Sequence, residues 1–566
     1  MHVEGMGARW PRMRFLLVAL LFAASCSSGK STTEPSSATV RPLIIHHGKF
    51  FGHAGAEALL VENGRIKALG GLDTLKAQAP SDVELLDAQG ALVLPGFHDS
   101  HVHAMGAGMG SLGVDLSEHQ TMDATLTALK KFAAEHPGDG WITGRGWQYG
   151  IVPAGQFPSR LQLDSAIPDR PVFVRSYDGH SGWANSLAFK KANVTAETKD
   201  PEGGKVVREA DGKTPQGTLL EGGMMVMEGA VPPPAPEVLK SALEGALKHL
   251  MESGYTSVEE IAFDPGEVDL LASLEKAGRL PLRVHVSLPL SGDLDAYEAI
   301  RKAHNSPLLR FGFLKGFNDG VIESQTAFML QAFEGSAETG KPLIAREKLF
   351  DLVEKAHARR FPVALHSIGD ASVRLALDAY EAAIKKHPDI KLRHRIEHIE
   401  VIDPADLPRF RQLDVIASMQ PFHANPGGPT PDDGVWSKNL GPARLKMSFA
   451  WRSLKDAGAP LAFGTDWPVM SDNPLWGLAL ATTRKDPNGQ PSNGWNAHQT
   501  LTFNDAVDAF TRGSSYAVGE EALVGTLDVG QLADVVILGA DVDPAQPATL
   551  WKGAVRTVIL LSLIHI

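Results

Sequence analysis

The chain has 566 residues, of which 43% are hydrophobic and 21% are charged, so it is long enough to bury a large core together with a smaller companion domain. Its 54 lysine and arginine residues face 66 acidic residues, and the formal net charge of −12 argues against nucleic acid as a partner. The one cysteine, Cys26, excludes an internal disulfide, a thiolate metal site and a cysteine nucleophile in the mature domain, so any metal must be held by nitrogen and oxygen ligands.

The two extreme ends of the chain are predicted to lie outside the fold. Two arginines precede the apolar run FLLVALLFAAS, which is too short to span a bilayer, and these features predict a signal peptide over residues 1–26. The small residues before Cys26 resemble a bacterial lipobox, in which the cysteine carries a lipid, but Ala23 replaces the usual leucine, so cleavage without lipidation stays open. Residues 27–41 are rich in Ser, Thr and Pro and are predicted to be a flexible linker, and we expect an exported protein of the periplasm or outer membrane. The last six residues, LSLIHI (561–566), match a translated transposon end used in preparing sequencing libraries and are expected to be artefactual.

Both ends of the remaining chain are predicted to be rich in β-strands. Residues 57–70 contain two apolar runs joined by the Asn-Gly pair at 63–64, a hairpin signal because both residues tolerate positive φ. Residues 525–541 form a second strand-like set. We therefore predict a small composite β-sandwich from residues 42–95 and 498–566, the second part beginning with a helix.

Between these ends, helical and strand patterns alternate. Residues 235–253 carry apolar side chains at helical spacing and are followed by the strand-like segment YTSVEEIAF. A helical pattern over 347–360 likewise leads into FPVALHSIGD, after which Asp370 is predicted to cap the next helix. This alternation predicts parallel strands and, at this length, a (β/α)8 TIM barrel over residues 96–497 rather than an open sheet.

One part of the barrel region breaks the alternation. Residues 140–225 are less periodic and include a predicted hairpin that turns at the Asp-Gly pair 211–212. We interpret this segment as an insertion over one mouth of the barrel, where it would shape the choice of substrate.

Six polar residues end apolar runs in this region, namely His101, His103, Lys315, His366, His398 and Asp466. Residues i and i+2 of a strand point to the same face, so His101 and His103 project together. A single buried histidine or a capping aspartate has an ordinary structural explanation, and Lys315 taken alone fits a surface lysine. However, the phenylalanines around Lys315 predict burial, where an unpaired ammonium is costly. Since all six lie where barrel strands end, which is where barrel active sites are built, we predict that they share one site.

This arrangement resembles the amidohydrolase superfamily. More narrowly, PGFHDSHVH, DGHSGWANSLA, KGFNDG, HSIGDASV, RHRIEHIE and FGTDWPV resemble its amidohydrolase-3 branch, the YtcJ-like metal-dependent hydrolases that include an N-substituted formamide deformylase. The resemblance covers about residues 42 to 555. It implies two divalent metal ions, the more buried one bound by His101 and His103 and the other by His366 and His398, with Lys315 bridging both as a carboxylated lysine and Asp466 both binding metal and acting in catalysis. Histidine and carboxylate ligands suit Zn²⁺ first, with Mn²⁺, Co²⁺ and Fe²⁺ also open.

The resemblance also implies a reaction. Two divalent ions lower the pKa of a bridging water from about 15.7 toward about 7 and polarise a carbonyl group, so a bridging hydroxide attacks the substrate. Asp466 would take the hydroxide proton and return it to the leaving amine. We expect a small-molecule substrate cleaved at a non-peptide C–N bond of an amide, formamide, urea or carbamate, with an ester or lactone as the less favoured alternative.

Further residues are assigned with the same reasoning. His180 lies in a loop where the family places substrate contacts, and Trp147 is predicted to line the pocket, although a tryptophan at an exposed edge of the insertion fits equally. Arg395 and Glu397, close to His398, are predicted either to support the metal ligands or to form an ion pair inside the barrel. Asp319 is predicted to fix the loop after Lys315. Two other histidines, His394 and His423, receive no role.

Two other functions stay open for this chain. A mononuclear deaminase of the same superfamily usually lacks the bridging lysine and has a glutamate three residues after the fifth-strand histidine, where this chain has Gly369. A non-catalytic lipoprotein that captures a solute is the second, but such a protein has no need of a water-activating set of six ligands. Metal analysis separates it from the enzyme, which should hold about two ions per chain.

Overall fold

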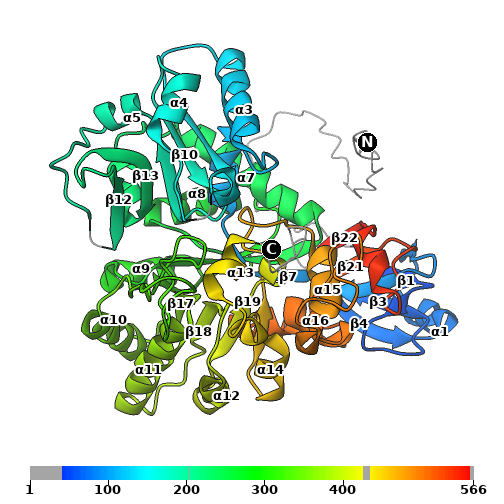
Figure 1. The fold of residues 1–566 in the computed structure, drawn as a ribbon. Helices are drawn as coiled ribbons and strands as arrows, with labels where there is room; N and C mark the ends of the chain where they lie inside the picture. Colours follow the sequence, from blue (N-terminus) through cyan, green and yellow to red (C-terminus); the bar gives the residue numbers. More distant parts are fainter. Residues whose placement is uncertain (1–40, 154, 202, 425–433, 561–566) are drawn as a thin grey trace.

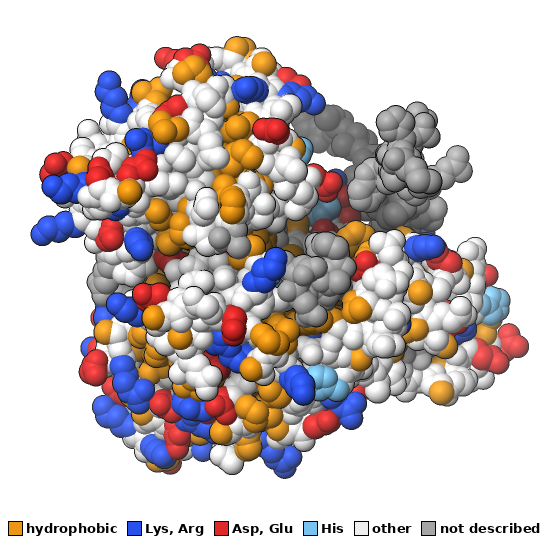
Figure 2. All heavy atoms as spheres, viewed as in Figure 1, with side chains coloured by type: hydrophobic (Ala, Val, Ile, Leu, Met, Phe, Trp, Pro, Cys, Tyr) orange, Lys and Arg blue, Asp and Glu red, His pale blue; other side chains and the backbone are white. Residues whose placement is uncertain are grey.

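A computed structural model describes residues 41–153, 155–201, 203–424 and 434–560. The predicted signal peptide, Cys26, the linker up to residue 40 and the last six residues lie outside this part. Figure 1 shows a barrel, an insertion beside one of its mouths and a small domain at its side. No helix within the described part combines the length and apolar character that crossing a membrane requires. On the face drawn in Figure 2, positive and negative side chains are interspersed.

Eight parallel strands form one sheet among the described residues, which confirms the predicted TIM barrel. In chain order they are β7 (Phe97–Val102), β14 (Tyr255–Glu260), β15 (Arg283–Pro289), β16 (Leu309–Phe317), β17 (Val363–Ser367), β18 (Arg395–His398), β19 (Ile416–Met419) and β20 (Leu461–Phe463). The end of β7 meets the segment just after β20, because the Asp466 N–H donates to the His101 carbonyl (2.8 Å) and the His103 N–H donates to the Trp467 carbonyl (2.8 Å). The barrel is therefore closed at the level of the predicted site.

Helices cover the outside of the barrel. Those that follow the strands include α2 (Ala104–Gly110), α8 (Pro265–Lys276), α9 (Leu294–Ala303), α11 (Asp370–Lys386), α12 (Leu407–Leu413), α15 (Pro474–Thr483) and α16 (Phe503–Asp508), and those that precede strands include α7 (Pro236–Glu252), α10 (Arg346–Ala358) and α14 (Trp451–Asp456). Helix α7 starts with proline, whose fixed φ suits a first helical position, and buries one apolar face that includes Leu243, Leu247 and Leu250.

The prediction that Asp370 caps α11 is wrong. Gly369 occupies the capping position with extended backbone angles, and Asp370 is the first helical residue. The Asp370 carboxylate instead accepts the N–H of Leu330 (2.8 Å), in the loop after β16, and that of Ala371 (2.9 Å). From inside the helix, its carboxylate thus holds that loop and also accepts one amide N–H of the first helical turn.

The insertion between β7 and β14 carries a six-stranded sheet within the described residues, in the order β12-β13-β11-β10-β9-β8. Its strands are β8 (Val114–Asp115), β9 (Ile142–Trp147), β10 (Val172–Ser176), β11 (Ser181–Ala184), β12 (Gly204–Arg208) and β13 (Pro215–Glu221), and its helices include α3 (Met122–Glu135), α4 (Arg160–Ala166) and α5 (Ser186–Lys191). β12 and β13 form the predicted hairpin, and Gly212 in its turn has φ 68°. The sheet begins at Val114, earlier than the predicted start of the insertion at 140.

The small domain joins both ends of the described chain. One sheet has the order β4-β3-β1-β5, with β1 (Leu43–His46), β3 (Ala58–Glu62), β4 (Arg65–Gly70) and β5 (Glu84–Asp87); the other has the order β2-β6-β21-β22, with β2 (Lys49–Phe50), β6 (Leu92–Pro95), β21 (Asp534–Leu538) and β22 (Val555–Leu560). Ile45 and Val61 of the first sheet share a buried cluster with Val93 and Val535 of the second. Blue N-terminal and red C-terminal strands accordingly lie side by side in Figure 1.

Candidate metal centre

The paired histidines lie at the end of β7, and Asp99 holds this end against the end of β20. The buried Asp99 carboxylate accepts the N–H of His101 (3.1 Å), the N–H of Thr465 (2.9 Å) and the Thr465 hydroxyl (2.5 Å). Gly464 permits this approach, since a Cβ at that position would lie 2.5 Å from the His101 nitrogen. The backbone that carries the two imidazoles is thereby fixed to the backbone that carries Asp466.

Asp466 lies at the junction of three predicted ligands. Its Oδ1 is 3.2 Å from Nε2 of His103 and 3.6 Å from Nε2 of His101, and its Oδ2 is 3.9 Å from Nδ1 of His398. One ligand atom from each of His101, His398 and Asp466 lies within 4.8 Å of the other two. Asp466 (φ 60°) and His398 (φ 75°) both adopt left-handed backbone conformations, which cost of order 1–3 kcal/mol each for such residues and concentrate at functional sites.

Lys315 and His366 complete the cluster. Lys315 on β16 is buried, with Nζ 3.3 Å from Nε2 of His101 and 4.8 Å from the centre of the Phe317 ring. Burial lowers the pKa of Lys315 to about 8, so a fraction of the molecules carry a neutral Lys315 amine near neutral pH. The neutral amine is the form that reacts with CO2. The His366 ring lies 4.5 Å from the His398 ring, centre to centre. The structure therefore brings all six predicted side chains together.

The protonation states of this cluster suit a divalent cation. Burial lowers the pKa of His101 to about 4 and moves those of His366 and His398 well below the ordinary value, so the imidazoles are neutral. Although burial opposes ionisation of Asp466, the neighbouring histidines hold its pKa well below the usual range. Oδ1 of Asp466 is buried and makes no hydrogen bond with any described residue. Neutral nitrogens around an ionised, unsatisfied carboxylate oxygen fit a bound metal ion.

A buried ion pair supports His101 from behind. Glu397 Oε2 is 2.7 Å from Nδ1 of His101, and Glu397 Oε1 is 2.6 Å from Nε of Arg395. Arg395 also pairs with Glu259 and donates to the Ser100 carbonyl (2.9 Å). Burial raises the pKa of Glu397, but Arg395 and His101 outweigh it and bring the pKa to about 2. Arg395 and Glu397 thus pair inside the barrel, and through Glu397 the pair fixes the ring that faces Asp466.

Several residues of this centre were not identified from the sequence. His423 Nε2 is 3.3 Å from Asp466 Oδ2, while its Nδ1 is 3.2 Å from Glu400 Oε1. Gln420 Oε1 is 2.9 Å from Nδ1 of His398. His423 and Gln420 both follow β19, on the same rim as the predicted ligands, and this position is the one signal that could have found them.

Glu260 at the end of β14 also supports the site. Its carboxylate accepts the first two amide N–H groups of α2 (2.7 and 3.0 Å), directly after His103.

Asp319, which was predicted to fix a loop, and His394, which received no role, both have clear positions. Asp319 accepts the N–H groups of Phe328 (2.9 Å), Ile368 (3.0 Å) and Gly369 (2.9 Å), so it fixes the loop after β16 as predicted. His394 lies away from the cluster, with Nε2 2.8 Å from Nδ1 of His357.

The insertion places His180 over the centre. The His180 ring lies 5.0 Å from the His366 ring, and its Nδ1 is 2.7 Å from Oε2 of Glu221. The other oxygen of Glu221 accepts the Thr326 hydroxyl (2.9 Å), so Glu221 links the insertion to the loop after β16. By contrast, Trp147 is fully buried in the core of the insertion, where its indole N–H donates to the Val174 carbonyl (3.2 Å). Trp147 packs the insertion rather than facing the cluster.

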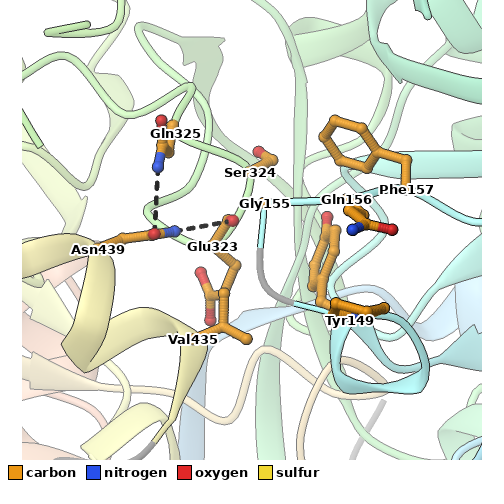
Figure 3. Close-up of a pocket in the computed structure, with 10 residues that line it drawn as sticks. Tyr149, Gly155, Gln156, Phe157, Glu323, Ser324, Gln325, Val435 and Asn439 are labelled. Carbon is orange, nitrogen blue, oxygen red and sulfur yellow. Dashed lines mark hydrogen bonds between the residues drawn. The ribbon is translucent and has the colours of Figure 1, made fainter. Parts of the chain in front are cut away.

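A cavity of about 100 Å³ lies where the insertion meets the barrel. Figure 3 shows Tyr149 and Phe157 of the insertion on one side and Glu323 and Asn439 on the other, the latter from α13 (Val435–Leu440). The Asn439 amide donates to the Glu323 backbone carbonyl (3.0 Å). The Glu323 carboxylate accepts the hydroxyl of Tyr177 (2.7 Å), which makes a second link between the two parts.

This chain is similar to several known proteins. Residues 84–560 match the model of a family described as the amidohydrolase family. The chain is 32% identical to the putative amidohydrolase YtcJ of Bacillus subtilis, over 87% of this chain and 92% of that protein, and 27% identical to the N-substituted formamide deformylase of Arthrobacter pascens, over 87% and 91%. An uncharacterised metal-dependent hydrolase from Pyrococcus furiosus has a similar fold, with a TM-score of 0.68 at 24% identity, over 89% of this chain and all of the other.

Proposed function

This chain belongs to the amidohydrolase family, a family of metal-dependent hydrolases, and we propose that it cleaves a non-peptide C–N bond in a small molecule. The observation that carries the proposal is the convergence of Asp466 with His101, His103 and His398 on a closed barrel rim. The relatives named as an amidohydrolase and a formamide deformylase favour an amide, formamide, urea or carbamate as the substrate group.

The six side chains of the cluster would hold two divalent ions, with Zn²⁺ favoured by the nitrogen and oxygen donors. His101 and His103 would serve one ion and His366 and His398 the other, while Lys315, once carboxylated, would offer an oxygen to each. Carboxylation turns a buried ammonium, which is costly, into an anionic ligand. When bound, the ions lower the pKa of a water molecule toward neutrality and polarise the scissile carbonyl group.

Asp466 is the residue proposed to move the proton. Its ionised carboxylate accepts a proton from the attacking water and returns it to the nitrogen of the leaving amine, so it acts first as a base and then as an acid. His423, with Nε2 3.3 Å from Asp466 Oδ2, is proposed to hold the carboxylate in place for both steps. His180, aligned by Glu221, is proposed to donate a hydrogen bond to the substrate from the side of the insertion.

A mononuclear deaminase is the nearest alternative, and the glycine at position 369 disfavours it. A Cβ at Gly369 would lie 2.1 Å from the Phe328 carbonyl oxygen, so the local backbone excludes the glutamate that such deaminases usually carry there. Burial of Lys315 against His101 also favours the two-ion arrangement over a single ion.

The test is hydrolysis of a panel of N-formyl and N-acyl amines, ureas and carbamates by protein reconstituted with Zn²⁺ or Mn²⁺, followed by detection of the released amine. We expect turnover of at least one class by the wild type and loss of that turnover in Asp466→Asn. Asp472→Asn is the matched control, because Asp472 pairs with His249 (3.0 Å) rather than with the cluster. The proposal fails if metal-loaded wild type hydrolyses none of the panel, or if Asp466→Asn is as active as the wild type.

We also propose that the enzyme is exported and anchored through a lipid on Cys26. Fractionation of cells that express the full chain should find it in the periplasm or outer membrane, and Cys26→Ala should release it from the membrane fraction. Recovery of the wild type in the cytoplasm would refute export.

A further inference from the structure

The small domain carries a second group of metal-binding side chains, outside the barrel. His46, His47 and Asp87 each offer a ligand atom, and these atoms lie within 4.8 Å of one another. Two imidazoles and one carboxylate form a donor set that suits borderline divalent ions such as Zn²⁺ and Cu²⁺. None of the three takes part in the cluster around Asp466. We propose that they form a separate three-ligand site for a divalent transition-metal ion.

The backbone explains why these side chains meet. β1 and β5 are parallel neighbours, and their register places His46 opposite Asp87. His47 follows directly after β1 with φ 54°, so the chain leaves the strand there. Adjacent residues of a continuing strand would point to opposite faces, but here the His46 and His47 rings lie edge to face with centres 4.4 Å apart.

One spacing within the group matches that of a coordination sphere. Metal–ligand bonds of about 2.0–2.1 Å in a tetrahedron separate the ligand atoms by about 3.3–3.4 Å. Nδ1 of His47 lies 3.3 Å from Oδ1 of Asp87. With three protein ligands, a water molecule would complete the tetrahedron, as in other open zinc sites.

Apart from the hydrogen bond between His47 and Asp87 themselves, neighbouring groups leave most of these ligand atoms available. The Asp87 carboxylate accepts the N–H of Gln89 (2.8 Å), but Arg556 donates to the Asp87 backbone carbonyl (3.2 Å) and not to its carboxylate. Nδ1 of His46 is buried and makes no hydrogen bond with any described residue. The side chains of His47 and Asp87 are 59% and 47% exposed, so an ion can reach them from solvent. Histidine atoms are visible on the surface at the right-hand end of the small domain in Figure 2.

A bound ion would hold the edge strand β5 in place. β5 is the last strand of its sheet and pairs with β1 alone among the described strands. Because His46 and His47 lie at the end of β1 and Asp87 at the end of β5, one ion would bridge the two strand ends. We therefore expect the ion to hold the ends of β1 and β5 together, separately from catalysis in the barrel.

The test uses the full chain with its barrel centre already loaded with Zn²⁺, titrated with further Zn²⁺ in a calorimeter. The wild type should take up one additional ion per chain, and the double variant His47→Ala, Asp87→Asn should lose it. His53→Ala is the matched control, because His53 lies in the same domain and pairs with Asp528 (3.2 Å), and this variant should retain the uptake. Equal uptake by the wild type and the double variant, or no additional uptake by either, would overturn the proposal.

A second measurement needs no variant and so does not depend on folding. Diethylpyrocarbonate modifies accessible histidines, and mass spectrometry of the peptide that contains His46 and His47 reports their modification. Added Zn²⁺ should protect this peptide in the wild type while leaving the His53 position reactive. Equal modification with and without Zn²⁺ would contradict metal binding at these residues.

Discussion

Replacement of Glu397 by glutamine tests how the barrel holds His101, the first proposed metal ligand. Glu397 is fully buried and lies 2.7 Å from Nδ1 of His101, with Arg395 on its other oxygen. Glutamine keeps the size of the side chain and an oxygen that can accept the imidazole proton, but it removes the charge that orients the ring and strengthens the imidazole as a ligand. Losing such a supporting partner typically lowers metal affinity about 10–100-fold, or roughly 1.4–2.7 kcal/mol.

The measurement is competition for Zn²⁺ between the protein and a fluorescent chelator of known affinity. Glu354→Gln is the matched control, since Glu354 also pairs with a histidine, His387 (2.5 Å), but on the outer face of the barrel, where such pairs contribute about 0–1 kcal/mol and do not touch the metal centre. We expect weaker binding in Glu397→Gln and unchanged binding in Glu354→Gln. Equal affinities in Glu397→Gln and the wild type would refute the role assigned to this carboxylate.

Three further changes test other parts of the account. Lys315→Ala should lose metal and turnover together, as measured by elemental analysis and amine release, and unchanged turnover would remove Lys315 from the mechanism. Glu221→Gln weakens a charge-assisted hydrogen bond to His180 and should raise KM about tenfold with a smaller effect on kcat; an unchanged KM in steady-state kinetics would contradict the substrate contact. Burial raises the pKa of Glu520, but His285 and the nearby arginines outweigh burial and lower this pKa from its ordinary 4.5 to about 2. The ionised Glu520 therefore stabilises the folded protein above pH 4.5, and this stabilisation disappears as the pH falls toward 2. Glu520→Gln in metal-free protein should therefore lose roughly 3 kcal/mol against unfolding at pH 7 and nothing near pH 2, and a loss that persists at pH 2 would contradict this assignment.

The barrel and the meeting of the six proposed ligands on its rim were predictable because the relevant information is local in the sequence. Barrel strands such as β16 and β17 contain apolar runs, and the predicted ligands lie near strand ends, as Lys315 does in β16 and His366 does in β17. Parallel strands bring such ends to one rim, so residues far apart in the sequence meet without any further signal. The Asn-Gly hairpin of the small domain was predictable for the same reason, because the turn requires residues that tolerate positive φ.

The supporting residues were harder to predict because their roles depend on both faces of a buried strand. In the segment YTSVEE, Glu259 and Glu260 resemble surface residues, yet both are buried since helices cover one face of the barrel sheet and its interior closes the other. Glu259 therefore pairs with Arg395, while Glu260 faces the start of α2. No spacing in the sequence distinguishes these two directions.

The start of the insertion and the position of Trp147 could not be predicted for a different reason. Its first strand, β8, has two residues, too few to give an alternating pattern, and it joins the sheet through backbone pairing with β9. Trp147 was expected either at the pocket or at an exposed edge of the insertion, but β9 places it in the core of the insertion, against Trp183. Both outcomes depend on contacts across the sheet, which the sequence alone does not specify.

The most direct test of the central claim is anomalous diffraction from a crystal of the Zn²⁺-loaded protein at the zinc absorption edge. The account predicts two peaks in the barrel, one against His101 and His103 and one against His366 and His398, with density for a carboxylated Lys315 between them. A barrel with no anomalous peak, or with its peaks away from Asp466, would contradict it.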